Sequence, residues 1–388
     1  MRPFEAIFVP HEAAEAVSDR AWLEALLEAE QALANAGSRA GIVPADAASA
    51  VTAACDPGLF DVGELAEQGR AAGNPVEPLV RAIRAHTGEK HGAWVHRGAT
   101  SQDILDTAAM LVSKRACGVI GGELSAVADR CAAAADAHRG TVMAARTLLQ
   151  QAVPTTFGLK AAGWLVAVVE SRRRLAAVAA TLPAQLGGAG GTMAAFGERG
   201  PELLRLFAAE VDLAEPTVAW HTLRTPVTDL AGALAGAAGA LGKVATDVVL
   251  LSQTEVAEVA EAEGGVSSTM PHKRNPIAAV LADACVRHVR ASAALLFESA
   301  VQEHERAAGA WHAEWAALSA ALAATAGAAS SIRRSLDGLH VDAARMRANV
   351  SPDVLSEAER LGIEAEKPED YLGSSDALID RALALYRG

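Results

Sequence analysis

Apolar residues recur at helical spacing along most of the chain, with polar residues between them. In residues 18–36 the apolar positions fall near one stripe, made by Trp22, Leu26 and Leu33. Ser18 is well placed to cap this helix, and Gly37 to end it. The pattern therefore predicts an amphipathic helix over residues 18–36 that covers a core with one face.

The same pattern predicts helices of two lengths, separated by proline, glycine and polar residues. Shorter helices are expected at 44–54, 61–71, 75–87 and 341–349. Longer segments are expected at 103–138, 156–181, 201–211, 226–262, 276–307 and 308–335. Most of these exceed the average helix length of about 11–12 residues, and alanine-rich helices of such length need partners on most faces. We expect an all-α chain whose long helices assemble with those of other subunits.

The spacing of these helices indicates three parts. An N-terminal helical domain is expected over residues 1–108, a central long-helix bundle over 109–335, and a shortened C-terminal helical segment over 336–388. The 388 residues are enough for two or three such parts with a large core.

Composition and charge narrow the function. The chain is 51% hydrophobic and only 4% aromatic, with a net charge of −13, which disfavours nucleic acid and anionic membranes as partners. Its four cysteines show no CxxC spacing, so reduced, buried thiols are expected. The apolar tract at 229–251 contains Asp229, Lys243 and Asp247, which favours a core helix over a membrane span. No signal peptide is apparent, and we expect a cytoplasmic protein.

Polar residues concentrate in three places. The first is residues 96–107, where Thr100 and Ser101 stand at the start of a predicted helix and favour an anion site or, alternatively, a simple cap with Ser101 as the capping residue. The second is residues 146–158, where Thr147 and Gln150 can bond a carboxylate, although Pro154 and the threonines after it also suit a plain helix connection.

The third place, residues 264–276, is the most informative. It combines glycines, hydroxyls, cations and an amide with two prolines, Pro271 and Pro276, so it cannot be regular helix. A flexible loop with Ser267, Lys273 and Asn275 suits closure on an anionic substrate whose charge grows in the transition state. Arg224, in the separate run 220–224, adds a possible cation, whereas its neighbour Trp220 is expected to be packing.

Two further patterns carry less weight. Glu255, Glu258 and Glu261 repeat every three residues, but no histidine lies at a matching helical step, so a solvated acidic face is favoured over a metal site. The glycine-rich run 187–192 follows no strand and has no P-loop pattern, so it gives little support for nucleotide phosphate binding.

Together the three polar regions resemble the fumarase/aspartase superfamily. Its loop Gly-Ser-Ser-x-Met-Pro-x-Lys-x-Asn-Pro is matched by residues 267–276, with Val266 where the family usually has glycine. The runs His96–Thr107 and Thr147–Gly158 match its two other regions in the right order. The resemblance covers roughly residues 15–345 and, within the superfamily, is strongest to bacterial 3-carboxy-cis,cis-muconate cycloisomerases.

The resemblance implies roles for particular residues. It makes Ser267 the proton-transfer residue, with Lys273 and Asn275 as charge stabilisers. The substrate-binding residues that it implies are His96, Thr100, Ser101, Thr147, Gln150, Arg224, Ser268 and Met270. For His96 two readings stay open, contact with the substrate or orientation of its loop. The family needs neither a metal nor an organic cofactor, and it forms homotetramers in which each active site takes its three regions from three subunits.

Leu148 is the departure that bears most on function. Adenylosuccinate lyases have a histidine at this position, which protonates the leaving group, and leucine cannot do so. This favours a cycloisomerase of protocatechuate (β-ketoadipate) catabolism, acting on a tricarboxylate. The alternatives are a lyase that releases fumarate from a substituted succinate, such as nitrosuccinate or adenylosuccinate, and a non-enzymatic structural protein on the same fold. The family's C-terminal domain is normally longer than the segment present here.

Overall fold

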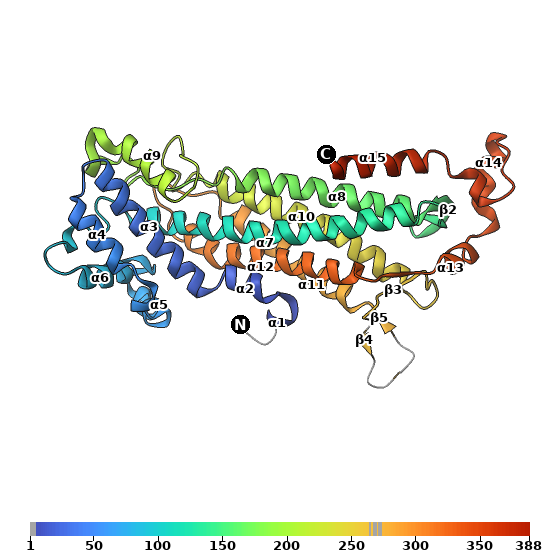
Figure 1. Ribbon diagram of the computed structural model, residues 1–388, viewed down its shortest axis with the longest axis horizontal. Helices are drawn as coiled ribbons and strands as arrows, with labels where there is room; N and C mark the ends of the chain where they lie inside the picture. Colours follow the sequence, from blue (N-terminus) through green and yellow to red (C-terminus); the bar gives the residue numbers. More distant parts are fainter. Residues whose placement is uncertain (1–4, 264, 267–269, 271–273) are drawn as a thin grey trace.

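The protein is an elongated, mainly helical molecule, as its computed structural model shows (Figure 1). The structure describes residues 5–263, 265, 266, 270 and 274–388. The helices α3 (Asp19–Arg39), α4 (Ala45–Ala54), α5 (Val62–Ala72) and α6 (Val76–Thr87) gather at one end, whereas the short α1 (Glu5–Phe8) and α2 (His11–Ala16) lie beside the middle of the molecule (Figure 1). Short 3₁₀ turns lie at Pro57–Leu59, Gly92–Trp94, Ala194–Arg199, Pro352–Leu355 and Pro368–Tyr371.

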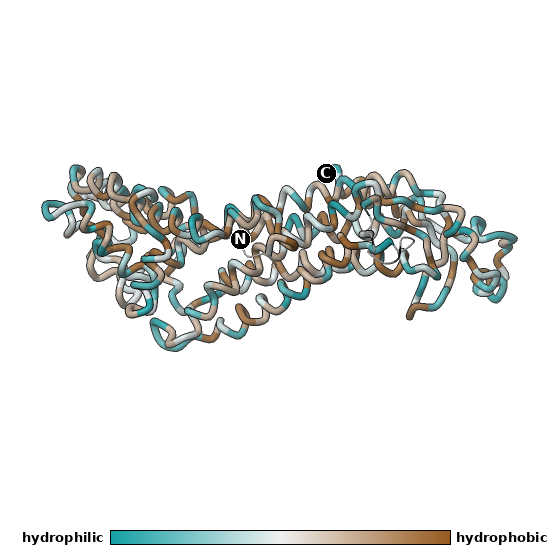
Figure 2. The backbone as a smooth tube through the Cα atoms, turned by 90° about the horizontal axis from the view of Figure 1, so that it is seen from below, coloured by the Kyte–Doolittle hydropathy of each residue, from teal (hydrophilic) through white to brown (hydrophobic). Residues whose placement is uncertain are grey.

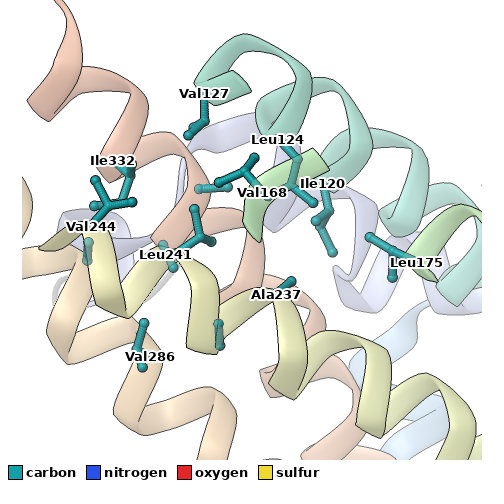
Figure 3. Packing of buried hydrophobic residues seen from close by; sticks show 14 of the residues in the cluster. Ile120, Leu124, Val127, Val168, Leu175, Ala237, Leu241, Val244, Val286 and Ile332 are labelled. Carbon is teal, nitrogen blue, oxygen red and sulfur yellow. The ribbon is translucent and has the colours of Figure 1, made fainter. Parts of the chain in front are cut away.

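Five long helices form the central bundle, and the all-α prediction is confirmed. They are α7 (Ser101–Ala137), α8 (Phe157–Ala179), α10 (Thr225–Leu251), α11 (Ile277–Glu298) and α12 (Ala310–Leu336). Their facing sides supply small aliphatic residues, and Figure 3 shows Ile120 and Leu124 of α7 beside Val168 of α8. Each such side chain contributes about 1.5–3 kcal/mol when fully removed from water, and the buried aromatic residues Phe157 and Trp164 of α8 belong to the same core.

A second hydrophobic core lies at the N-terminal end. It is built by α3, α4, α6 and the first turns of α7, but it also receives α9 (Gly200–Glu210) and Leu186. The N-terminal core is therefore not formed by residues 1–108 alone, because a return of the chain between α8 and α10 packs against it.

Trp220 is 4% exposed and donates from Nε1 to the carbonyl of Ala184 (2.8 Å), so its expected packing role is confirmed.

The strands are few and short. β1 (Val142–Thr147) and β2 (Gln150–Thr156) form an antiparallel hairpin in which Thr147 pairs with Gln150. Two smaller antiparallel pairs are β3 (Val259–Ala260) with β6 (His340–Val341), and β4 (Gly265–Val266) with β5 (Arg274–Asn275). All of these lie at the end of the bundle opposite α4 and α6 (Figure 1).

The C-terminal segment returns along the bundle. It contains α13 (Ala343–Ala348), α14 (Ser356–Leu361) and α15 (Ser375–Arg387), and α15 packs against α8. Arg139 pairs with Asp380 (2.6 Å), and the Tyr386 hydroxyl donates to Asp129 (2.5 Å). These contacts hold the last helix on the outside of the bundle.

Several predicted boundaries were wrong. Gly37 does not end the first long helix, which continues to Arg39; a Cβ at Gly37 would lie 2.7 Å from Val43 Cγ2, so glycine is needed there for close packing. The helix predicted over 226–262 stops at Leu251, and Ala257 adopts a left-handed φ of 49°. The segments predicted over 276–307 and 308–335 are separated by the non-helical residues 299–309.

The acidic residues after α10 explain the early end of that helix. Glu258 is fully buried and Glu261 is 6% exposed, so the expected solvated acidic face is wrong for both. Glu258 accepts two hydrogen bonds from Arg146 (3.0 and 2.6 Å), and Glu261 accepts from the backbone N–H groups of Ala278 and Ala279 at the start of α11. A continuous helix would not deliver both carboxylates to these partners.

Two helices, α10 and α12, are long and apolar enough to cross a membrane by composition alone. Both pack within the bundle, with 56% and 78% of their most apolar windows buried, which agrees with the expected core helix at 229–251. Figure 2 shows apolar residues along the length of the bundle rather than in one band across it.

The four cysteines are free and buried, and burial raises the thiol pKa of Cys55, Cys117 and Cys131 to about 12.

Candidate active site

The start of α7 is held by one buried carboxylate. Asp103 is fully buried and accepts the backbone N–H of Thr100 (2.9 Å), which makes Thr100, not Ser101, the capping residue. It also accepts the N–H groups of Gly187 and Gly188 (2.8 and 2.9 Å), and its Oδ1 lies 2.7 Å from His221 Nε2. Asp103 therefore fixes the helix start, and it occupies the two glycine N–H groups that a phosphate would need.

His96 lies four residues before this helix start and is tied to the N-terminal core. Its Nδ1 is 2.6 Å from Oε1 of Glu30, a fully buried residue of α3. Burial works against the charged imidazole, but the nearby Glu30 carboxylate outweighs it and raises the pKa of His96. His96 also adopts a left-handed φ of 58°, an uncommon conformation for a residue with a side chain.

Arg306 adds a cation that the sequence reasoning missed. It lies in the non-helical stretch between α11 and α12 that the pattern predicted as helix. Its Nη1 donates to the Thr100 hydroxyl (3.2 Å) and its Nη2 to the carbonyl of Ala189 (3.1 Å). The charged run from Glu303 to Arg306 was the available signal. A guanidinium beside the N–H groups of a helix start favours binding of a carboxylate.

The second region forms the tip of the β1–β2 hairpin. Thr147 and Gln150 are opposite each other and exposed, and they bracket Leu148 and Leu149, whose φ angles are 51° and 66°. Leu148 is 97% exposed. The hairpin is anchored below its tip by the bidentate pair of Arg146 with Glu258, so the tip presents its two polar side chains on a fixed base.

The third region is described only in part. Ser267, Ser268 and Lys273 lie outside the described residues. Asn275 is half-buried and pairs with Gly265 across the β4–β5 ladder, and Met270 is 41% exposed. A cavity of about 150 Å³ lies beside Asn275 and is also lined by Ser252, Arg274 and His340. This places an amide and polar groups at the end of the bundle where the hairpin lies.

Arg224 does not lie free for a substrate. It is 3% exposed, and its guanidinium donates to Asp106 (2.8 and 3.1 Å) and to Glu314 (3.0 and 2.6 Å). It also lies over the Trp220 ring, 4.7 Å from the centroid. Because every edge of the guanidinium is engaged within the chain, the structure gives Arg224 a place in an internal ion-pair network.

The candidate residues lie at two ends of one chain. His96, Thr100 and Arg306 are at the start of α7, whereas the hairpin lies at its other end and the β4–β5 ladder with Asn275 projects from the side of the bundle near that end (Figure 1). The 37 residues of α7 span about 55 Å at 1.5 Å per residue. A single chain cannot bring these groups around one small molecule. Among the described residues, no group of three or more acidic, histidine or cysteine side chains is arranged to hold a metal ion.

Arg306 offers a direct test of the anion site at the start of α7. Arg306→Gln is expected to raise the KM for a carboxylate substrate about tenfold, which corresponds to losing one charge-assisted contact. Steady-state kinetics and thermal unfolding of the same samples measure it. Arg70→Gln, which removes an exposed cation of α5, is the control and should change neither. An unaltered KM in Arg306→Gln would remove Arg306 from the site.

Comparison with known proteins gives a consistent family. Residues 11–290 match a family model described as Lyase. The chain is 49% identical over 353 residues to nitrosuccinate lyase of Streptomyces davaonensis, covering 86% of this chain and 74% of that protein. It is 42% identical over 379 residues to 3-carboxy-cis,cis-muconate cycloisomerase of Bradyrhizobium diazoefficiens, covering 95% and 83%.

A solved structure matches the whole fold. The crystal structure of 3-carboxy-cis,cis-muconate lactonizing enzyme from Pseudomonas putida superimposes with a TM-score of 0.92 at 34% identity, covering 100% of this chain and 99% of that one. The chain thus shares its architecture along its full length with a protein of the group that the polar loops resemble.

Proposed function

The chain belongs to the fumarase/aspartase lyase superfamily, and from that membership we propose that it is a cycloisomerase converting 3-carboxy-cis,cis-muconate to a carboxymuconolactone. The observation that carries the proposal is the full-length structural match to a 3-carboxy-cis,cis-muconate lactonizing enzyme, with a TM-score of 0.92. Leu148 is compatible with it, because it stands at the hairpin tip where adenylosuccinate lyases have a proton-donating histidine. Because leucine cannot donate a proton, this position suits only a reaction whose leaving group does not need to be protonated. Ring closure by a carboxylate is such a reaction, because the group that is added or expelled is itself a stable anion.

The chemistry follows from the three regions. One carboxylate oxygen of the substrate attacks a conjugated carbon of the same molecule, so a C–O bond forms and the π electrons move onto another carboxylate. Lys273 and Asn275 stabilise the resulting aci-carboxylate by preorganised charge and hydrogen bonding. Ser267 then supplies the proton to the adjacent carbon, and the carboxylate is restored. No metal or organic cofactor takes part in these steps.

Substrate carboxylates are held by the polar groups that surround the loop. Thr100, Ser101 and Arg306 hold one at the start of α7, where helix N–H groups and a cation coincide. Thr147 and Gln150 hold another from the hairpin tip. Ser268 and Met270 contact the substrate from the third region. Arg224 stays in the internal network and only supports the helix start.

We further propose a cytoplasmic homotetramer in which each site combines regions from three subunits. The long separation of the regions along α7 supports the sharing of sites between subunits. Exposed apolar groups support it: Leu148 and Leu149 at the hairpin tip are 97% and 75% exposed, and Leu295 and Phe297 of α11 are 44% and 49% exposed. Apolar side chains at such exposure are favourable once another subunit covers them.

A shared site has a specific consequence in mixed tetramers. Ser267→Ala and Thr147→Val chains should each be inactive as homotetramers, yet regain activity when the two are denatured and refolded together. Some sites then receive an intact Ser267 from one chain and an intact Thr147 from another. Activity that never recovers, or a protein that remains a 39.8 kDa monomer by light scattering, contradicts the shared site.

Elimination of nitrite from nitrosuccinate is the second candidate. It is favoured by the 49% identity to a nitrosuccinate lyase, which exceeds the 42% identity to the cycloisomerase of Bradyrhizobium diazoefficiens. Nitrite leaves as a stable anion, so Leu148 suits this reaction equally well. In this direction Ser267 would remove the proton next to a carboxylate, and the same loop would stabilise the aci-carboxylate.

One pair of assays separates the candidates. The protein is incubated with 3-carboxy-cis,cis-muconate while the diene absorbance is followed, and in parallel with nitrosuccinate while nitrite and fumarate are measured. Loss of the diene signal, absent in the Ser267→Ala control, supports the cycloisomerase. Nitrite and fumarate with an unchanged diene signal overturn it in favour of the lyase.

A further inference from the structure

Glu30 is a buried acid that neither the family resemblance nor the proposed reaction has used. It lies on α3 within the predicted apolar stripe, four residues after Leu26 and three before Leu33, and is fully buried. Its Oε1 is 2.6 Å from His96 Nδ1, while its Oε2 is buried and has no hydrogen-bond partner among the described residues. A buried carboxylate with one unpartnered oxygen is costly unless a nearby cation balances it.

Among the described residues around Glu30, His96 is the cation that can balance its buried carboxylate. Arg84 of α6 and Asp103 of α7 also act on the His96 ring, and Cys55 at the end of α4 lies in the field of Glu30. Asp103 is already bonded to two glycine N–H groups, Thr100 and His221, and no direct Arg84–Glu30 contact exists among the described residues. The only direct polar partner of Glu30 in the described chain is therefore His96.

The contact also fixes which nitrogen is available. With Nδ1–H donated to Glu30, only Nε2 of His96 can reach another molecule, and no described residue bonds it. The ring belongs to a residue with a φ of 58°, four positions before Thr100, so its backbone is set in an uncommon conformation next to the anion site. The left-handed backbone and the buried acid together specify one ring position.

We propose that Glu30 is the positioning residue of the active site, holding His96 as an imidazolium whose Nε2–H binds one carboxylate of the substrate. This rests on the proposed function, because it gives His96 a task on that substrate. It also decides between the two readings of His96 left open by the sequence. Asp103 already holds the start of α7, and Nε2 of His96 has no bond from a described residue, so it is available to the ligand.

Charge removal without change of shape is the sharpest test. Glu30→Gln keeps an oxygen that can accept from Nδ1, but it removes the negative charge that favours the imidazolium. The fall of kcat/KM at rising pH, which marks deprotonation of His96, is expected to move to lower pH by about one unit. On the falling limb of the profile the loss should therefore be about tenfold. Glu28→Gln, which removes a partly buried carboxylate of the same helix that pairs with Arg115 rather than with His96, is the matched control.

Two further variants separate positioning from folding. Glu30→Asp retains the charge and should keep the pH profile closer to that of the wild type, even if kcat/KM falls. In a His96→Gln background, Glu30→Gln should cause no additional loss, because its effect passes through His96. A Glu30→Gln protein with the wild-type pH profile, or with a loss that adds fully to that of His96→Gln, overturns the proposal.

A readout without substrate keeps this test independent of the proposed function. The pH dependence of deuterium exchange at Cε1–H of the His96 ring, followed by mass spectrometry of its peptide, reports the charge of that ring directly. Its midpoint should fall in Glu30→Gln and stay unchanged in Glu28→Gln. If neither muconate nor nitrosuccinate reacts, the proposed function fails. If the midpoint pH of the exchange is the same in Glu30→Gln as in the wild type, the proposed pairing of Glu30 with His96 is wrong.

Discussion

Replacing Arg224 by methionine is expected to lower the free energy of unfolding by about 3–5 kcal/mol, because two carboxylates would remain buried without a cation. Asp106 and Glu314 are 1% and 3% exposed and both accept two hydrogen bonds from this guanidinium. Burial raises the pKa of Glu314, against the opposing effect of Arg224. Urea unfolding at fixed protein concentration measures the change.

The control is an arginine of the bundle whose ion pair is open to solvent. Arg174 pairs with Glu170 one turn away on α8 at 2.8 Å, with side chains 65% and 47% exposed. Arg174→Met should therefore change the free energy of unfolding by less than about 0.5 kcal/mol. Adding Glu314→Gln to Arg224→Met should recover part of the loss, since it removes one of the stranded charges.

This experiment also decides between the sequence-based role of Arg224 and the structural one. A substrate-binding arginine would raise KM and leave stability unchanged. An internal tie among α7, α10 and α12 would lower stability, and Arg224→Lys would rescue it only in part, because an ammonium cannot form a fork with both acids. Arg224→Met with wild-type stability and a raised KM would refute the internal role.

The helices could be predicted because their signal is local. The apolar spacing that gave 103–138 and 156–181 corresponds to α7 (Ser101–Ala137) and α8 (Phe157–Ala179), within two residues at each boundary. Local capping chemistry also held: Ser18 accepts the N–H of Ala21, and Thr156 that of Leu159. Such signals need only the neighbours that the sequence already displays.

The site was harder to predict because its contacts are distant. The hairpin tip uses Leu148 and Leu149 at positive φ, where tight turns normally carry Asn-Gly, so no turn signal marked it. Arg146 pairs with Glu258, which lies 112 residues later in the sequence. Glu258 lies in the part of the predicted helix 226–262 that is not helical. In the sequence, Glu30 is only an acidic residue within an apolar stripe. Its role as the partner of His96 follows from the contact between them in the structure.

Gly158→Ala is expected to lower the free energy of unfolding by about 2–3 kcal/mol, although alanine is the better helix former. Gly158 is the second residue of α8 and donates its N–H to the carbonyl of His138 (2.9 Å). A Cβ there would lie 2.7 Å from the carbonyl oxygens of Ala135 and His138, and 2.8 Å from the nitrogen of Arg139. All three atoms are backbone, so the end of α7 or the start of α8 must move.

Gly163 on the same helix provides the opposite case. It is exposed, and a Cβ would meet nothing within 4 Å, so Gly163→Ala should stabilise the protein by about 0.5–1 kcal/mol through helix propensity. Thermal or urea unfolding of both variants measures the difference in sign. Because the turn under Gly158 leads directly into the β1–β2 hairpin, Gly158→Ala should also reduce turnover, whereas Gly163→Ala should not. If both variants had the same free energy of unfolding, the prediction would be wrong, and the backbone at the junction of α7 with α8 would move to accept the Cβ at little cost.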